Sequence, residues 1–400
     1  VSKLQGTGGK YLMHADIASG KGDQIEAETS DVSGAIGIVS PVKAGAYKER
    51  MDDDLVRITG DKNSSFTLSG DTYEYGDGAW KYALASEDIG GTGLGWYLSN
   101  NQTVSNMGTA VLGSVIAPNI GRLEEGALYS QLGSIDYASA DRSEARAWGY
   151  AIYSKFKYTD AASAPYEGAI ADDTYAENKY YGLTGGMDKL VNATETGSFY
   201  AGAMMGYGEG TLDVTGGEAD DNSFHAGLYG IYKWTDGLYA AGIIKYNRYR
   251  TNVTARPEEG GAYRADYNQD GWSVSALAGK RFDLKNNWYA EPQAELGYQR
   301  IGSASYEIGG SDIAIDSTNS VRARLGVAVG RKVTTESGKT LDFYVKASVL
   351  REFDGETNIS INGDPFKTDF GGTWGQYKLG IDYWNADNFG ARAAIVYENG

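Results

Sequence analysis

The sequence predicts an all-β protein. Its expected parts are the end of a parallel β-helix, a short linker α-helix and an antiparallel transmembrane β-barrel of about twelve strands. Two observations predict the barrel. From Ala145 to the C-terminus, apolar and polar side chains alternate in runs of about ten residues, and polar, turn-rich stretches separate the runs. The chain also holds 56 Gly and 31 Tyr, which suit close-packed β-structure and membrane interfaces.

The composition permits a membrane barrel and argues against several other classes of protein. Mean hydropathy is −0.42, and no stretch approaches the ~18 apolar residues of a membrane helix. A barrel strand escapes that test because only alternate residues face lipid. The chain has no cysteine, which excludes disulfides and thiolate chemistry, and its net charge of −17 disfavours nucleic acid as a partner.

Residues 1–101 are expected to form the last rungs and the cap of a parallel β-helix. Short β-like runs are separated by Gly, Asp, Asn and Ser at uneven spacing. Trp80 and Trp96 are expected to be core or cap aromatics that cover the open end of the stack. A β-sandwich remains the alternative for this region, and sugar binding the alternative for the two tryptophans.

Residues 102–143 are expected to be a linker with a helix at 119–134. The alternation stops here, and apolar residues recur at helical spacing. Glu124 and Glu125 follow Pro118 in the first turns, where the helix dipole favours acidic side chains. A surface helix packed on a soluble core is the alternative.

Residues 144–400 are expected to form the barrel, with short turns on one side and long polar loops such as 159–176, 250–269 and 354–371 on the other. The segment 286–299 shows the pattern best, because Trp288 and Ala294 share an apolar face and Glu295 lies on the opposite one. The strands are expected near 145–158, 177–188, 197–208, 223–234, 237–249, 270–283, 286–299, 320–333, 340–353, 373–385 and 389–398.

The inner face of this barrel mixes acidic and basic residues. Such a wall suits a wet lumen better than an apolar ligand cavity. The side chains expected to face the lumen include His225, Lys245, Glu291, Glu295, Arg322, Arg324, Lys346 and Arg392.

The order of these parts resembles the autotransporters of type V secretion over nearly the whole chain. GAWKYALA (78–85) and GLGWYLSN (93–100) are similar to the passenger end, or autochaperone, of pertactin-like proteins. LYSQLGSID (128–136) and EARAWGYAIYSKFKY (144–158), the expected first barrel strand, complete the resemblance.

The resemblance implies an outer-membrane barrel that exports its own passenger, with residues 1–101 at the cell surface and the linker helix in the lumen. It also implies outer-membrane lipid, the passenger, the barrel-assembly machinery and periplasmic chaperones as partners, and a monomeric chain with links to adhesion and virulence. An outer-membrane porin or adhesin whose barrel is itself the functional unit is the alternative, and an all-soluble β-protein is a weaker one. The lumen helix would present Ile120, Leu123, Glu124, Ala127, Leu128 and Leu132.

No enzyme chemistry, cofactor or metal site is expected. His14 and His225 lack a partner at ligand or triad spacing. Some family members cut themselves between two adjacent asparagines of the lumen helix, but Asn119 is followed here by Ile120. The pair Asn100–Asn101 precedes the helix and is expected to be a solvated turn, so a passenger that stays attached is as well supported as a cleaved one.

The sequence also suggests that the chain is part of a longer protein. Its first residues, 1–10, contain neither an initiator Met nor an apolar signal core. Eleven strands are counted, whereas single-chain bacterial barrels have an even number. Asn399–Gly400 is a strong two-residue turn signal, so one more strand is expected after Gly400.

Overall fold

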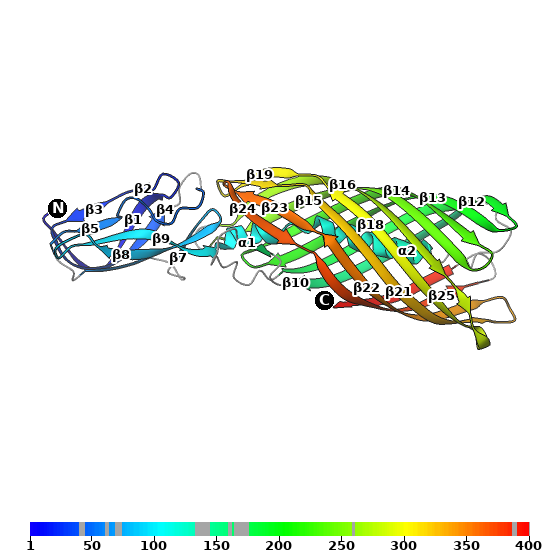
Figure 1. The fold of residues 1–400 in the computed structure, drawn as a ribbon. Coiled ribbons are helices and arrows are strands. Elements are labelled where there is room, and N and C mark those ends of the chain that lie inside the picture. The colour runs from blue at the N-terminus through cyan, green and yellow to red at the C-terminus, as the bar shows by residue number, and fades with distance from the viewer. Residues whose placement is uncertain are drawn as a thin grey trace.

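The computed structural model describes residues 1–39, 45–60, 64–68, 74–132, 145–158, 162–163, 176–257, 261–385 and 390–399. The molecule is elongated, with a small β-rich part at the N-terminal end and a large barrel at the other, joined by a helical linker (Figure 1). This is the all-β arrangement with one short helical region that the sequence predicts.

The N-terminal part is built on parallel ladders, as a β-helix requires. Its first sheet has the order β2-β1-β4-β6, in which β1 pairs with β4 and β4 with β6 in parallel. Tyr11, Phe66 and Trp96 form a chain of edge-on ring contacts, with centroids 6.1 and 5.0 Å apart. The β-sandwich alternative is wrong, because the strands of a sandwich pair in antiparallel fashion and these ladders are parallel. The strands are β1 (Lys3–Asp16), β2 (Lys21–Gly22), β4 (Thr29–Val39) and β6 (Ser65–Leu68).

A second sheet has the order β3-β5-β9-β8-β7 and runs along this part, with β3 and β5 at the end away from the barrel and β7 toward the linker (Figure 1). The pair β3–β5 is parallel, whereas β5–β9, β9–β8 and β8–β7 are antiparallel, so the rungs end in a meander that cannot continue the stack. The strands are β3 (Ile25–Ala27), β5 (Val56–Ile58), β7 (Glu74–Asp77), β8 (Trp80–Asp88) and β9 (Leu94–Val104). We call the three antiparallel strands β7, β8 and β9 the cap.

The linker holds two helices, α1 (Asn106–Gly113) and α2 (Ala117–Leu132). Ser105 caps α1 by accepting a hydrogen bond from the Gly108 amide at 3.0 Å. Helix α1 is not apparent from the sequence, because six of its eight residues are buried and no polar face reveals the helical period. Pro118 lies in the first turn of α2, where its missing amide hydrogen costs nothing.

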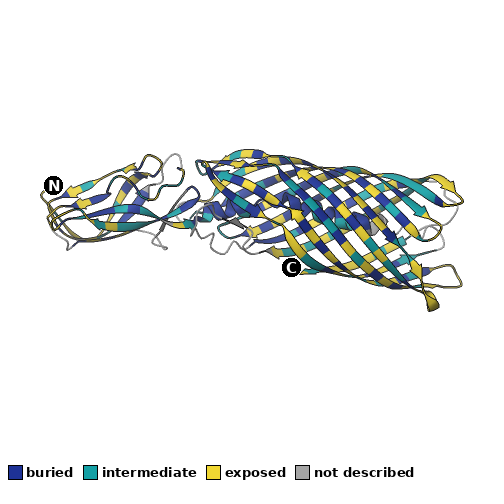
Figure 2. Cartoon of the chain, in the orientation of Figure 1, coloured by how far each residue is buried: buried dark blue, intermediate teal, exposed yellow. Residues whose placement is uncertain are grey.

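The barrel sheet follows the order β10-β12-β13-β14-β15-β16-β18-β21-β22-β25-β26, with every pairing antiparallel and β17 attached to β18. Buried and exposed residues alternate along most of these strands (Figure 2). Its strands are β10 (Arg146–Tyr158), β12 (Ala176–Thr194), β13 (Gly197–Val214), β14 (Gly217–Trp234), β15 (Leu238–Ala255), β16 (Tyr263–Lys280), β17 (Phe282–Asp283), β18 (Trp288–Ile301), β21 (Thr318–Thr334), β22 (Thr340–Asp354), β25 (Gly372–Trp384) and β26 (Gly390–Asn399), with the 3₁₀ turn η2 (Lys285–Asn287).

The strands on the side of the linker are longer than the sequence predicted. Residues 250–269 were expected to be a loop, but β15 runs to Ala255 and β16 starts at Tyr263. The expected loop 354–371 contains two further strands, which belong to a separate five-stranded sheet with the order β11-β24-β23-β20-β19. These are β11 (Ala162–Ser163), β19 (Ala304–Ile308), β20 (Ser311–Ile315), β23 (Glu356–Ile361) and β24 (Asp364–Asp369).

The first and last strands of the barrel sheet, β10 and β26, each have one neighbour among the described residues. Eleven strands thus follow one another in the sheet, in agreement with the count from the sequence. Within the same residues, neither helix has the length and apolar character needed to cross a membrane.

Candidate functional site

Helix α2 lies inside the barrel, where it contacts β10, β15 and β18 (Figure 1). The approach is close at Gly121. A Cβ atom on this residue would overlap Gln299 Nε2 and would lie 2.8 Å from Tyr249 Oη. Ile120, one of the predicted lumen residues, is completely buried beside it. Glycine thus lets the helix backbone reach the barrel wall.

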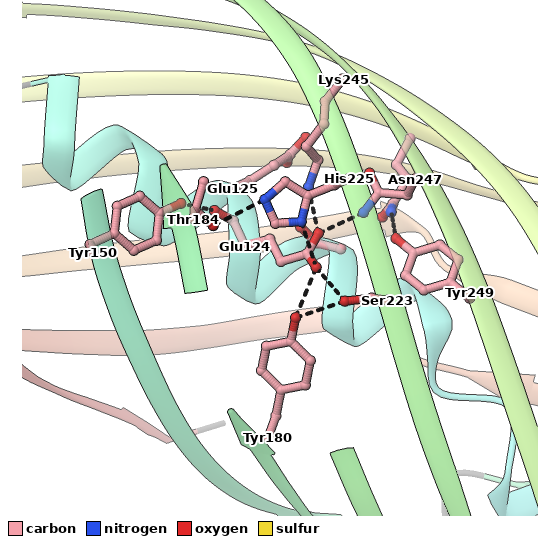
Figure 3. A network of polar contacts seen from close by, with 12 residues as sticks. Glu124, Glu125, Tyr150, Tyr180, Thr184, Ser223, His225, Lys245, Asn247 and Tyr249 are labelled. Atoms are coloured by element: carbon pink, nitrogen blue, oxygen red, sulfur yellow. Dashed lines mark hydrogen bonds and ion pairs between the residues drawn. The ribbon is translucent and has the colours of Figure 1, made fainter. Parts of the chain in front are cut away.

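Glu124 is the centre of the contacts between α2 and the wall (Figure 3). Its Oε2 atom accepts hydrogen bonds from Lys245 Nζ at 2.9 Å and Asn247 Nδ2 at 2.6 Å, both on β15. Lys245 Nζ also lies 3.4 Å from the Gly121 carbonyl oxygen. The side chains of Glu124 and Lys245 are each only 1% exposed, so this ion pair is fully removed from solvent.

The second carboxylate oxygen of Glu124 engages two other strands. Oε1 accepts hydrogen bonds from Tyr180 of β12 at 2.9 Å and Ser223 of β14 at 2.7 Å. His225 Nδ1 lies 3.0 Å from the same oxygen, and its Nε2 atom is 3.0 Å from the Thr184 hydroxyl. With five polar groups around it, the carboxylate has partners for all its lone pairs. We call Glu124 and these partners the Glu124 network.

The charged neighbours of Glu124 on α2 contact other parts of the wall. Glu125 pairs with Arg322 of β21 at 2.8 Å, and Arg122 pairs with Glu398 of β26 at 2.5 Å. Arg322 also approaches Glu295 at 3.9 Å, and Glu295 pairs with Arg324 at 2.6 Å. Acidic and basic side chains of the helix are thus each matched by the opposite charge on the wall. Buried pairs of this kind fix one geometry, because the loss of one partner leaves the other as a buried charge without a counter-charge.

Other predicted lumen residues lie elsewhere along the barrel interior. Leu128 and Tyr129 of α2 join a buried cluster with Met204 and Tyr229 of the wall. Leu123 packs against the main core, Ala127 is half-buried, and the side chain of Leu132 lies outside the described residues. Three predicted residues bind other wall residues: Glu291 accepts from Tyr239, Lys346 donates to Gln293, and Arg392 pairs with Asp382.

Sequence reasoning missed several partners in these networks. Ser223 and Asn247 lie two residues from the predicted His225 and Lys245, and Tyr180 lies on the inward face of β12, so the alternation could have identified all three as lumen-facing. Glu398 shares the inward face of the predicted Arg392, but its pairing with Arg122 carried no signal in the sequence, because it depends on how far the sheet curls before it meets the helix.

The tryptophans of the N-terminal part have different neighbours. Trp96, on β9 of the cap, is buried against Phe66 of the rungs. Trp80 is fully buried at the junction with the barrel, where its Nε1 atom donates to Asp364 Oδ2 at 2.7 Å and its ring lies 5.4 Å from that of Phe366. The Tyr47 amide donates to the same Asp364 oxygen at 2.6 Å.

The asparagines considered for self-cleavage lie in two places. Asn100 and Asn101 belong to β9, where Asn100 pairs with Tyr82 and its side chain accepts from the Gln102 amide. The pair is therefore strand rather than the expected turn. Asn119 lies in the first turn of α2. Among the described residues no group of three His, Asp or Glu side chains could hold a metal ion.

The fold and this site define a transmembrane β-barrel whose lumen is occupied by a helix that leads to an external β-helical part. The model of the autotransporter β-domain family matches residues 147–395, and the chain belongs to that family. It is therefore an outer-membrane barrel with its passenger end at the cell surface.

The two Bordetella relatives are much longer than this chain. Pertactin of Bordetella parapertussis is 33% identical over 207 residues, which covers 51% of this chain and 22% of pertactin. The BrkA autotransporter of Bordetella pertussis is 25% identical and covers 89% of this chain and 34% of BrkA. The solved translocator domain of NalP from Neisseria meningitidis shares the fold, with a TM-score of 0.51 at 14% identity over 72% of this chain and 94% of that one.

Proposed function

We propose that this chain is the translocator unit of an autotransporter, which exports its own N-terminal passenger and then holds it at the cell surface. The observation that carries the proposal is the Glu124 network, because it fixes in the lumen the segment that connects the cap to the barrel wall. A porin whose open barrel is the functional unit is not favoured, since α2 occupies the lumen.

Cross-linking in intact outer membranes tests this arrangement. Cysteines in place of Arg122 and Glu398 should be joined by a short flexible reagent, because the two side chains are in contact across the lumen. Cysteines in place of Arg122 and Tyr397 form the matched control, since Tyr397 is adjacent in sequence but faces outward and is 62% exposed. Equal cross-linking of both pairs would contradict the placement of the helix.

Surface display is tested with an epitope inserted between Gly90 and Gly91 of the full-length protein. Both glycines have positive φ, and a Cβ atom on either would meet nothing within 4 Å, so the turn tolerates an insertion. We expect antibody to label intact cells. Labelling only after the outer membrane is opened would exclude export of this end.

The passenger end is proposed to stay attached, with no catalytic activity in this chain. Support comes from the position of Asn100–Asn101 in the paired strand β9 and from the absence of an Asn–Asn pair in α2. Immunoblots of outer membranes with the same epitope should detect it at the size of the uncut protein. A fragment that lacks the barrel would contradict this.

Insertion is proposed to depend on the barrel-assembly machinery and periplasmic chaperones, and the inserted chain to be a monomer. Large apolar side chains of the outer wall, such as Leu228, Leu325 and Ile395, are 61 to 73% exposed. A chain with so much apolar surface would aggregate in the periplasm without protection. Depletion of that machinery should lower the folded barrel in outer membranes, and native mass should match one chain.

A further inference from the structure

On β15, β16 and β18, outward-facing arginines occur only in one half of each strand. Arg248 and Arg250 on β15, Arg264 on β16 and Arg300 on β18 all point outward in the half of the strand nearer the cap. The opposite halves of these strands carry no outward arginine; they present apolar residues and Lys280. This asymmetry assigns the arginines to the side of the membrane that holds the passenger.

The arginines lie directly beyond the apolar belt and its aromatic rim. Ile244, Val274 and Leu296 are 44 to 59% exposed on these strands. Tyr246, Trp272 and Tyr298 follow two residues further on each strand, and the Trp272 and Tyr298 rings lie 5.2 Å apart. Aromatic rims mark the depth of the lipid headgroups. The next outward residues after Tyr246 and Tyr298 are Arg248 and Arg300, at the depth where lipid phosphates lie.

The strand register places these arginines within reach of one headgroup. Arg248 of β15 lies opposite Asp270 of β16, and Arg300 of β18 lies opposite Trp272 of β16. Asp270 and Trp272 are two residues apart on β16. Two strand spacings and one two-residue step separate Arg248 from Arg300, so their backbones lie roughly 12 Å apart. Arginine side chains from both positions can close much of that distance.

The local carboxylates leave the arginines available. Arg248 and Asp270 are 4.0 Å apart and Arg250 and Asp266 are 3.8 Å apart, with every side chain 57 to 60% exposed. Exposed pairs at such distances contribute little. Arg300 donates to the neutral side chains of Asn319 and Ser317. Arg248, Arg250 and Arg300 against two aspartates leave a net positive site on a chain whose net charge is −17.

We propose that Arg248, Arg250 and Arg300 form a binding site for the phosphorylated headgroup of a lipid in the outer leaflet of the outer membrane. The planar guanidinium groups match phosphate oxygens bidentately, and the aromatic rim below supports the sugar or acyl part of the lipid. The site lies on the outer wall, so it is independent of the lumen helix and of export.

Native mass spectrometry of the purified full chain in a neutral detergent tests the site. The probes are a glycolipid with two phosphate monoesters (lipid A), the same lipid with its phosphates removed, and inorganic phosphate. We expect retention of the phosphorylated lipid alone, weakened by salt. The triple variant R248Q/R250Q/R300Q should bind about a hundredfold more weakly, from about fivefold per arginine.

Two controls keep the outcome decisive. R331Q removes an exposed outward arginine at the opposite end of β21 and should leave lipid binding unchanged. D270N removes the carboxylate that competes for Arg248 and should strengthen binding. Heat-dependent electrophoretic mobility verifies that each barrel is folded; if the triple glutamine variant does not fold, the triple lysine variant replaces it and should bind with reduced affinity. The proposal would be overturned if the folded triple variant bound the phosphorylated lipid as tightly as the wild type does. It would also be overturned if the dephosphorylated lipid or inorganic phosphate bound the wild type as tightly as the phosphorylated lipid does.

Discussion

Glu124 shows how one residue can hold two parts of a protein together. A carboxylate buried in a barrel would be strongly disfavoured by itself, and here five polar groups from three strands surround it. The network therefore specifies the depth and rotation of α2 rather than adding general stability, since a pair of this kind gains little over apolar packing.

Replacement of Glu124 by Gln should loosen the helix. The change leaves Lys245 buried without its counter-charge, which costs about 3–5 kcal/mol for a buried pair. The readout is protease cleavage of α2 in folded barrels, which should rise sharply, while the double variant E124Q/K245M should recover much of the loss. Glu209→Gln, on the exposed outer wall, should change nothing. Equal resistance of E124Q and the wild type would contradict this role.

The two glycines of α2, Gly121 and Gly126, offer a matched pair at the same scale. A Cβ atom on Gly121 would overlap Gln299 and crowd Tyr249, whereas one on Gly126 would meet nothing within 4 Å. G121A should lower the melting temperature of the barrel, with an overpacking cost of about 1–3 kcal/mol. G126A should be neutral or stabilising by up to about 1 kcal/mol through helix propensity. Thermal unfolding followed by electrophoretic mobility would separate them, and an equal loss in both would refute the tight contact.

At the scale of elements, strand β18 presents adjacent residues to different media. Ala294 is exposed on the outer wall, and Gln293 points inward towards Lys346. Ala294→Arg should block assembly, because an arginine facing lipid near the membrane centre costs about 2–4 kcal/mol. Gln293→Arg should be tolerated better. The amount of folded barrel in outer membranes measures both, and equal tolerance would mean that this face does not meet lipid.

The sequence predicted the existence and the two faces of the strands well, but not their ends on the passenger side. Alternation of apolar and polar residues marks where a strand is in lipid, and it stops where the outer face becomes charged, as at Arg248 and Arg250. The ladder of β15 nevertheless continues to Ala255. Helix α1 was missed because it is buried on all sides, and the partners of Glu124 depend on sheet register, which a single sequence does not encode locally.

At the scale of the whole molecule, a continuous buried core runs from the rungs through α1 into the mouth of the barrel. It includes Ile36 of β4, Val111 of α1, Tyr249 of β15 and Phe366 of β24. Asp364 is the polar joint in this core, because it accepts hydrogen bonds from Trp80 and the Tyr47 amide. The cap and the barrel are thus packed as one unit.

Asp364→Ala should weaken that joint without unfolding the barrel. The buried Trp80 donor and the half-buried Tyr47 amide would lose their acceptor, and the buried donor alone costs about 1–3 kcal/mol. Limited proteolysis should release residues 1–101 faster, and Trp80 fluorescence should shift towards that of a solvated indole. Asp369→Asn on the same strand, where the side chain is exposed, is the control. An unchanged proteolysis rate would show that apolar contacts alone hold the cap.

The contacts of α2 also depend on the circumference of the barrel. Arg122 binds β26 and Glu124 binds β12, although these strands stand near opposite ends of the sheet order. Two residues on one helix therefore require that the wall curl through almost its full turn. A wall with one strand fewer or more would satisfy one contact and lose the other, so the helix selects the diameter of the barrel that encloses it.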